Sequence, residues 1–241
     1  MEGHYRQAVS SDIDPLILVN PHCFGQEEIQ DSSEERAGVS EILQSRRLIS
    51  VSHPQPHDRS SISTFLDEEN DTPLFIHLAY GLAYTVGSAL GSRPPSEETC
   101  LAAYIVPNKA GLTAGSRAWS KHSHRSLPIP SDTAEEDKQK RSAGWWGTPA
   151  GPVSLINERS LRLLWKVMDN ATWRNLHWLP HEVLVYEVRV AEGYGMRWSQ
   201  DQVDRPDGVK KENRPWIFRG FVEPVMENGH ELRWRHPISP S

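Results

Sequence analysis

The sequence is poor in cysteine, with only Cys23 and Cys100 in 241 positions. Two cysteines cannot form the disulfide framework of a small secreted domain, and their spacing is not that of a metal site. A nucleophile built on His22-Cys23 would need an activated thiolate, and no neighbouring residue in the sequence supplies that activation. The scarcity of cysteine favours a reducing compartment. We therefore expect the cytoplasm, with the nucleus as the alternative.

Long hydrophobic runs are also missing. The first residues lack the apolar core of a secretory signal. The apolar run that most resembles a membrane span, residues 74–90, has seventeen residues without a formal charge and contains His77, Gly81 and Gly87. A membrane-spanning helix needs about 20 predominantly apolar residues, so this run is more typical of a buried helix. We expect no membrane partner.

Tryptophan is absent from the first 118 residues, and all nine tryptophans lie between Trp119 and Trp234. Charge divides the chain in a similar way: residues 1–71 carry a formal charge of -9, whereas the remainder sums to +3 within the total of -6. The pattern predicts an acidic, largely flexible segment over 1–71 and one folded domain over 72–241. A polar stretch at about 120–143 reads as a loop inserted into that domain.

The periodicity of the second part predicts an α+β fold. Thr72-Pro73 is a typical helix start, and the helix is expected to reach about residue 90. Asn157 is the expected cap of a second helix that runs to about Asn170. Strands are expected at 101–106, 183–190, 194–199, 216–223 and 231–236. They predict an antiparallel meander of four or more strands, packed against the two helices.

Within the strand 183–190, alternation places Leu184, Tyr186, Val188 and Val190 on one face, which should be the buried one. In the strand 216–223, the same rule places Arg219, Phe221 and Glu223 with Ile217 on one face. An arginine and a glutamate among apolar neighbours should be paired or should face a ligand. A cross-strand salt bridge on the solvent side is the alternative.

The densest group of ionisable residues next to an apolar strand contains His177 and His181. Pro180 argues against a helix here, and in an extended segment both imidazoles would lie on one side. A histidine could then act as a general base or as a metal ligand, with His230, Glu231 or His236 as a third ligand. The alternative is that the pair caps a strand entry through hydrogen bonds to loop carbonyls.

Arginine and tryptophan alternate through the last third of the chain, as in Arg197-Trp198. Such pairs stack on one another and also hold nucleobases and phosphates. Residues 171–241, however, carry ten basic and ten acidic residues, so the segment lacks the basic excess that drives non-specific nucleic-acid binding. We therefore expect no such binding. Recognition of one anion or one base in a pocket remains open.

The sequence thus predicts a small-molecule-binding or enzymatic domain with a pocket of His, Arg and Glu residues at the strand ends. The expected catalytic residues are His177, His181 and His230, and the expected ligand-binding residues are Arg197, Arg219, Glu223, Trp198 and Trp178. The alternative is a non-catalytic module that uses exposed Trp and Arg side chains to bind a protein or carbohydrate partner. A third alternative is a protein partner bound through residues 1–71. The sequence identifies no cofactor and leaves a bound metal undecided.

Overall fold

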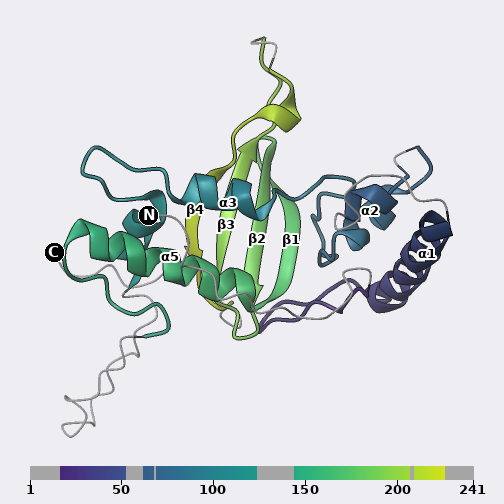
Figure 1. Ribbon diagram of the computed structural model, residues 1–241, viewed down its shortest axis with the longest axis horizontal. Coiled ribbons are helices and arrows are strands. Elements are labelled where there is room, and N and C mark those ends of the chain that lie inside the picture. The colour runs from purple at the N-terminus through teal and green to yellow at the C-terminus, as the bar shows by residue number, and fades with distance from the viewer. Residues whose placement is uncertain (1–16, 53–61, 68, 124–143, 207–208, 226–241) are drawn as a thin grey trace, which may run out of the picture.

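The computed structural model describes residues 17–52, 62–67, 69–123, 144–206 and 209–225 (Figure 1). Within these residues the chain forms five α-helices and one antiparallel sheet of four strands in the order β1-β2-β3-β4. The predicted α+β class with an antiparallel meander is therefore confirmed.

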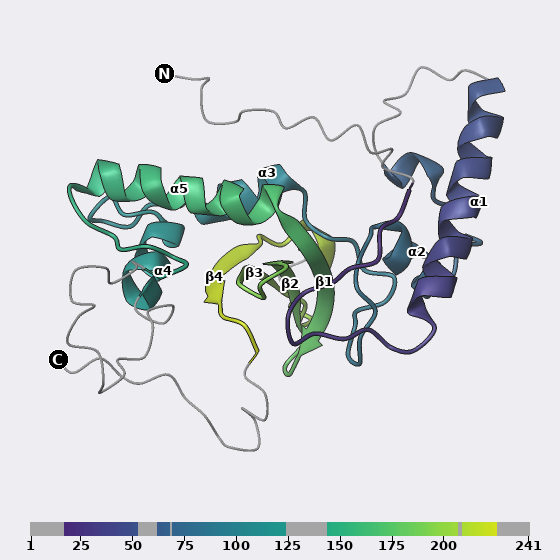
Figure 2. The ribbon, with the colours of Figure 1, turned by 90° about the horizontal axis from the view of Figure 1, so that it is seen from below.

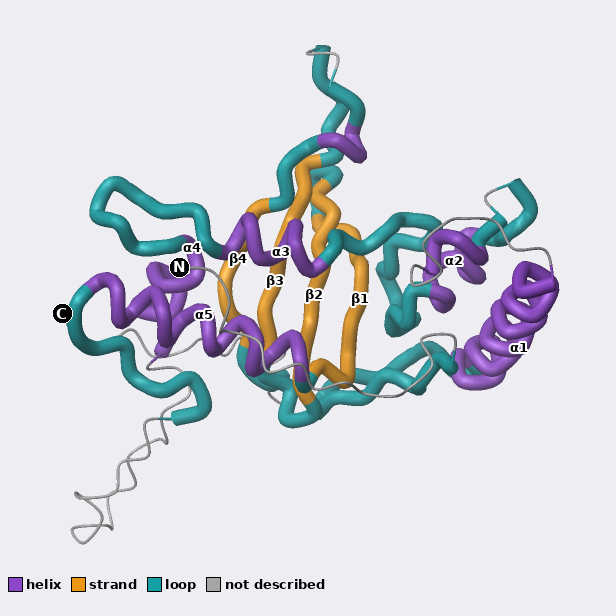
Figure 3. Tube along the Cα trace, viewed as in Figure 1, coloured by secondary structure: helices purple, strands orange, loops and turns teal. Residues whose placement is uncertain are grey.

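The five described α-helices precede all four strands in the sequence, and the strands lie side by side at the centre of the molecule (Figure 3). The helices are α1 (Ser32–Ser52), α2 (Pro73–Ala79), α3 (Glu97–Tyr104), α4 (Ala114–His122) and α5 (Val153–Asp169). The strands are β1 (Ala171–Leu179), β2 (Val183–Val190), β3 (Gly195–Asp201) and β4 (Ile217–Val222). Two short 3-10 helices, η1 (Ile62–Phe65) and η3 (Lys211–Asn213), lie in the connections.

One face of the sheet carries the main hydrophobic core, beneath α3 and α5 (Figures 1 and 2). As predicted from alternation, Leu184, Tyr186 and Val188 of β2 belong to this core. Trp198 of β3 is completely buried there, and its indole N–H donates to the carbonyl of Cys100 at 3.0 Å. Buried indoles usually find such a partner, because an unpaired N–H costs free energy. Tryptophan on β3 is therefore a core residue.

Strand β4 departs from the predicted alternation because it contains a bulge. Trp198 pairs with Phe218 and Arg197 pairs with Gly220, so Arg219 is an extra residue between them. Gly220 has φ of +136°, a backbone conformation that glycine adopts far more readily than other residues. The bulge turns both Phe218 and Phe221 into the core and leaves Arg219 exposed. The predicted grouping of Arg219, Phe221 and Glu223 on one face is therefore wrong.

Two other predicted elements differ from the structure. The predicted strand at 101–106 is wrong, because these residues fall largely in α3, whose Ser96 cap accepts from the N–H of Thr99 at 3.2 Å. The helix predicted to reach residue 90 starts as expected, with Thr72 accepting from the N–H of Phe75, but it ends at Ala79 before Gly81, which has φ of +66°. Strand β1 was missed. The predicted strand at 231–236 lies outside the described residues.

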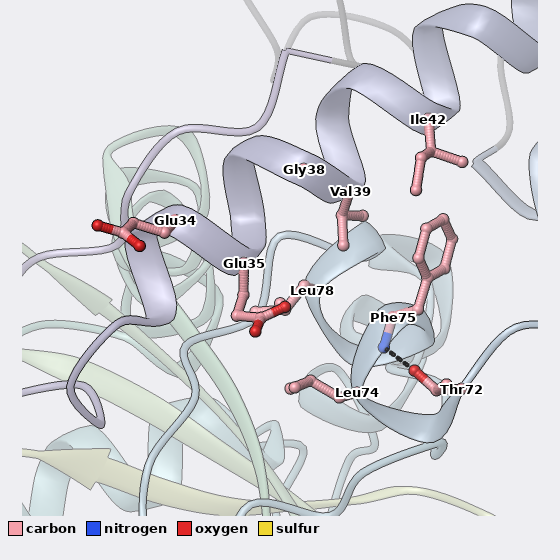
Figure 4. A pocket seen from close by; sticks show the side chains of 9 residues that line it. All are labelled: Glu34, Glu35, Gly38, Val39, Ile42, Thr72, Leu74, Phe75 and Leu78. Carbon is pink, nitrogen blue, oxygen red and sulfur yellow. Dashed lines mark hydrogen bonds between the residues drawn. The ribbon is translucent and has the colours of Figure 1, made fainter.

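Described residues of the N-terminal part are hydrogen-bonded to the sheet: the N–H of His22 donates to the carbonyl of Thr172 at 3.0 Å, and that of Phe24 donates to the carbonyl of Ala191 at 2.9 Å. Helix α1 lies along α2, and the two helices border a hollow of about 340 Å³ with an apolar floor that includes Val39 and Leu78 (Figure 4). Arg36 of α1 is 1% exposed and forms a two-pronged ion pair with Glu28 at 2.5 and 2.9 Å. The described residues of the acidic segment therefore include a long helix with a buried ion pair. No helix of the described part has both the length and the apolar character needed to cross a bilayer.

Candidate functional site

The sheet face opposite α3 and α5 carries polar side chains arranged in rows across the strands. The strand register places Asn175 of β1, Glu187 of β2, Arg197 of β3 and Gly220 of β4 in one row. The next row contains His177, Val185 and Ser199. Paired residues on one face of a sheet lie about 4.5–5.5 Å apart, so these side chains are neighbours although they come from separate strands.

Glu187 is the centre of a buried charge network. One carboxylate oxygen accepts from Nε of Arg189 and the other accepts from Nε of Arg197. Burial by itself raises the pKa of Glu187, but the two guanidinium charges and their hydrogen bonds outweigh it, and the pKa lies below its usual range. Glu187 is therefore an ionised carboxylate with both oxygens engaged.

Arg189 holds this carboxylate from the side away from solvent. Its side chain is 3% exposed, and Nη1 donates to the carbonyl of Gly193 and, at 2.9 Å, to the carbonyl of Glu223. Gly195 lies opposite Arg189 in the register, and a Cβ added there would come 2.8 Å from Cγ of Arg189. The absence of a side chain at position 195 thus lets Arg189 lie flat on β3.

Arg197 differs from Arg189 in its exposure. Its side chain is 38% exposed, and its Nε–H is held by Glu187, whereas its two Nη groups make no hydrogen bond with any described residue. A guanidinium fixed at Nε presents its remaining N–H groups as a planar fork, which matches the oxygens of a phosphate or carboxylate. Arg197 lines a polar hollow of about 220 Å³, together with His177, Asn175 and Glu187.

The wall of this hollow comes from the N-terminal half of the chain, through Gln26 and residues 85–87. The segment 82–89 runs along the outer edge of β1, where the N–H of Ala83 donates to Arg174 and that of Trp178 donates to Gly87. Asn175 ties its side chain to this wall, because its amide donates to Thr85 Oγ1 at 2.9 Å and accepts from Ser88 Oγ at 3.1 Å. The wall and the floor are thus one hydrogen-bonded unit.

His177 has the properties of a neutral imidazole at physiological pH. It is partly buried in the hollow, and burial lowers its pKa; the Glu187 charge opposes this shift, and the charges of Arg197 and Arg189 add to it. An imidazole with a lowered pKa is free to accept a proton at neutral pH. Neither ring nitrogen of His177 has a hydrogen-bond partner among the described residues. The ring nitrogens of His177 are therefore available to bind a ligand.

The structure separates the residues that the sequence grouped into one site. His177 and Arg197 line the hollow, and so does Trp178, which is 46% exposed at the end of β1. His181 lies in the exposed β1–β2 turn with φ of 65° and does not line the hollow. Three further predicted residues also lie elsewhere: Trp198 in the core, Arg219 in the exposed β4 bulge, and Glu223 beyond the end of β4. His230 lies outside the described residues.

The most important residues that sequence reasoning missed are Glu187, Arg189 and Asn175. Alternation had placed Glu187 and Arg189 together on the face of β2 opposite the core, and a glutamate and an arginine two positions apart within a hydrophobic strand were the available signal. A charged pair amid apolar residues should be buried with a partner. Asn175 carried no comparable signal, since β1 itself was missed.

The structure leaves the suggested metal site untested, because its third ligand lies outside the described residues. Among the described residues, no group of three or more His, Cys, Asp and Glu side chains comes close enough to hold an ion. Glu187 has both oxygens engaged by guanidinium groups, which removes it as a ligand. The proposed further ligands His230, Glu231 and His236 lie outside the described residues. Cys23 is buried, and burial raises the pKa of its thiol to about 11, which excludes an activated thiolate.

The comparisons with known proteins bear on this face of the sheet. Residues 133–223 match the family model described as CdiA C-terminal tRNase toxin domain. The match covers less than half of the chain, and it spans the region from α5 to β4. It therefore includes His177, Glu187 and Arg197, but not the wall formed by Gln26 and residues 85–87. No curated protein and no solved structure matches the chain.

This match corrects the functional predictions made from the sequence. It points to a nuclease toxin, so the predictions of a small-molecule-binding domain and of a non-catalytic module for a protein or carbohydrate partner are wrong. The expectation of no non-specific nucleic-acid binding is contradicted as well, because the matched family is described as a tRNase toxin domain, and a tRNase acts on RNA. The charge count failed because it averaged over residues 171–241. It did not register that an ionised Glu187 is enclosed by two arginines, one of which faces the hollow.

Proposed function

We propose that this chain is an RNA-cleaving enzyme whose active site is the hollow on the open face of the sheet. The observation that carries the proposal is a coincidence of position. The stretch that matches the family model contains the side chains of the hollow best suited to phosphodiester chemistry, His177 and Arg197. Transfer RNA is the substrate that the name of the matched family indicates, and it is the first substrate to test.

The proposed reaction uses His177 as the general base. The neutral imidazole takes the proton of a ribose 2′-hydroxyl, the 2′ oxygen forms a bond to phosphorus, and the bond from phosphorus to the 5′ oxygen breaks. The 5′ oxygen takes a proton from water, and the imidazolium returns its own proton to the hydroxide that remains. The products are a 2′,3′-cyclic phosphate and a 5′-hydroxyl end.

Arg197 would hold the phosphate during this step. Arg197 lines the hollow and Glu187 fixes its Nε, so the guanidinium needs little reorganisation when charge develops on the phosphate oxygens. Glu187 itself is a poor candidate for a proton acceptor, because its pKa is lowered and both oxygens are engaged. We assign Glu187 and Arg189 as positioning residues for Arg197.

The experiment is a cleavage assay on total tRNA with the full-length chain, followed by analysis of the RNA ends. We expect His177→Ala to lower kcat/KM by about 10²–10⁴-fold, the usual contribution of a general base. Arg197→Ala should lower it by about 10²–10³-fold, the usual effect of removing a group that stabilises developing negative charge. Arg197→Lys should rescue only part of this loss, because an ammonium cannot form a planar fork.

Matched control variants are provided by two residues of the same types outside the hollow. His181→Ala changes an exposed turn histidine, and Arg219→Ala changes an exposed arginine of the β4 bulge. Both should cleave at the wild-type rate. Fragments that end in a 3′-hydroxyl, or equal losses in the hollow variants and the control variants, would overturn the proposed reaction.

A further inference from the structure

We infer that the turn formed by residues 85–88 reads a nucleobase of the RNA, and that this turn determines the nucleotide preference of the site. The inference rests on the proposed function and adds the recognised chemistry, the Watson–Crick edge of an unpaired base. It assigns a role to a segment outside the stretch that matches the nuclease family model.

The geometry of the turn leaves its central peptide groups unpaired. The N–H of Ser88 donates to the carbonyl of Thr85 at 3.1 Å, and Gly87 in the third position has φ of 88°. Val86 in the second position has no positive φ, so the turn is of type II. The N–H groups of Val86 and Gly87 and the carbonyl of Val86 make no hydrogen bond with any described residue.

These unpaired groups lie at the border of the hollow. Val86 and Gly87 both line it, and Val86 is 92% exposed. The carbonyl of Val86 and the N–H of Gly87 belong to one trans peptide group and point in opposite directions, so a base edge can meet only one of them together with the N–H of Val86. Two neighbouring backbone groups are enough to bind two positions of a base edge. A base must be unstacked to reach such a surface, which makes a single-stranded loop the expected target.

The turn is also held rigidly, as recognition requires. On one flank, Ala83 and Ala89 donate to the carbonyls of Arg174 and Leu176 in β1, and the carbonyl of Gly87 accepts from Trp178. On the other flank, Glu28 accepts from the N–H of Tyr84 at 2.7 Å, and Arg36 donates to the carbonyl of Leu82 at 3.1 Å. A surface fixed in this way loses little conformational entropy on binding.

The site thus extends from the phosphate-facing Arg197 to the turn in one direction across the sheet. Neighbouring strands lie about 4.8 Å apart, and the turn borders β1, so the backbone of Arg197 is roughly three strand spacings from the turn. His177 lies between them on β1. A nucleotide whose phosphate lies on Arg197 would direct its base, or the neighbouring base, toward residues 85–87.

The test uses two substitutions that change the turn by different means. Val86→Pro removes one N–H donor at a turn position where proline is favoured, so the turn should persist. Gly87→Ala adds a methyl group with no atom within 4 Å, but it strains the positive φ and should shift the central peptide group. Gly147→Ala is the matched control, because Gly147 also has positive φ and open space but does not line the hollow.

The assay compares four single-stranded RNA oligonucleotides that differ only in the base next to the bond cleaved in tRNA. We expect the wild-type protein and Gly147→Ala to prefer one base, and we expect Val86→Pro and Gly87→Ala to reduce the ratio of kcat/KM values by roughly tenfold. His177→Ala should slow all four substrates equally and keep the ratio. Unchanged ratios in both turn variants would overturn the inference.

A binding experiment distinguishes a failure of this inference from a failure of the proposed reaction. The same four sequences made with 2′-O-methyl ribose cannot be cleaved, and their affinities can be measured by fluorescence anisotropy. The inference is supported if the wild-type protein binds one of the four sequences more tightly and Val86→Pro loses this preference. If that result is found and no RNA is cleaved, only the proposed reaction is refuted. Equal affinity of the wild-type protein for all four sequences, without discrimination in cleavage, would overturn the inference.

Discussion

Replacing Glu187 with glutamine tests whether the charge network under the hollow has the role assigned to it. The substitution keeps the shape of the side chain but removes the charge that compensates Arg189, which is 3% exposed and surrounded by the sheet. Breaking a buried ion pair from one side leaves an uncompensated charge and usually costs about 3–5 kcal/mol. We expect Glu187→Gln to lower the free energy of unfolding by this amount, as measured by urea denaturation.

The control for this measurement is Glu158→Gln on α5. Glu158 also pairs with an arginine, Arg162, but that side chain is 66% exposed. Exposed pairs of this kind contribute about 0–1 kcal/mol, so the variant should unfold close to the wild-type midpoint. Equal and small effects of the two substitutions would refute the reasoning, because they would mean that Arg189 needs no buried counter-charge.

The same variant makes a second, independent prediction about catalysis. Glu187 raises the pKa of His177 against the larger lowering by burial, so its removal should lower the pKa of His177 further. The acidic limb of the pH profile of kcat/KM should therefore move to lower pH in Glu187→Gln. It should move to higher pH in Arg197→Gln, since Arg197 lowers that pKa. Shifts in the same direction, or none, would show that His177 is not the titrating base.

Three further predictions concern the fold. In Gly115→Ala, the new Cβ would lie 2.0 Å from the Tyr104 ring. The substitution should therefore destabilise the chain by more than the usual cost of overpacking, which is about 1–3 kcal/mol. Thermal unfolding measures this effect, and an unchanged midpoint would contradict the packing. Burial lowers the pKa of His77 in the folded state. The free energy of unfolding should therefore be highest above the pKa of the unfolded histidine, about 6.5, and should fall as the pH drops toward the lower pKa of the folded state. In urea titrations, His77→Gln should reduce this loss between about pH 7.5 and about pH 5.5. Burial also raises the pKa of Cys23 to about 11 and that of Cys100 to about 12, so both thiols should react with iodoacetamide at pH 8 only after denaturation, and rapid native labelling would refute their burial.

How far the fold could be predicted depended on how local each signal was. Strand β2 was predicted with its correct bounds and its correct core face, because its alternation is uninterrupted over eight residues. The start of α2 was also predicted, since Thr72 and Pro73 act within one turn of helix. The residues of α3 were taken for a strand, because an apolar run of six residues has no clear period and the decisive Ser96 cap precedes it.

The site was harder to predict because its residues meet only through the strand register. His177 and Arg197 were chosen for their residue types, and the structure brings both to the same hollow. Arg219 could not be separated from them in advance, because one extra residue at the β4 bulge reverses the face of every later side chain. The wall at 85–87 was beyond prediction, since about 90 residues separate it from the strand that it borders.

The floor and the wall of the hollow come from different parts of the sequence, and this explains why the composition gave a wrong prediction of function. The stretch that matches the nuclease family model supplies the floor of the hollow, with its paired charges, whereas residues that precede this stretch, Gln26 and 85–87, supply the wall. Two carboxylates of this region are already paired within the protein: Glu28 with Arg36 and the N–H of Tyr84, and Glu187 with Arg189 and Arg197. An overall charge of -6 is therefore compatible with an electropositive fork at one point of the surface. Recognition in such a site must depend more on the fit to one nucleotide than on long-range electrostatic attraction. Residues 85–88 should therefore control the nucleotide preference and not the overall affinity for RNA.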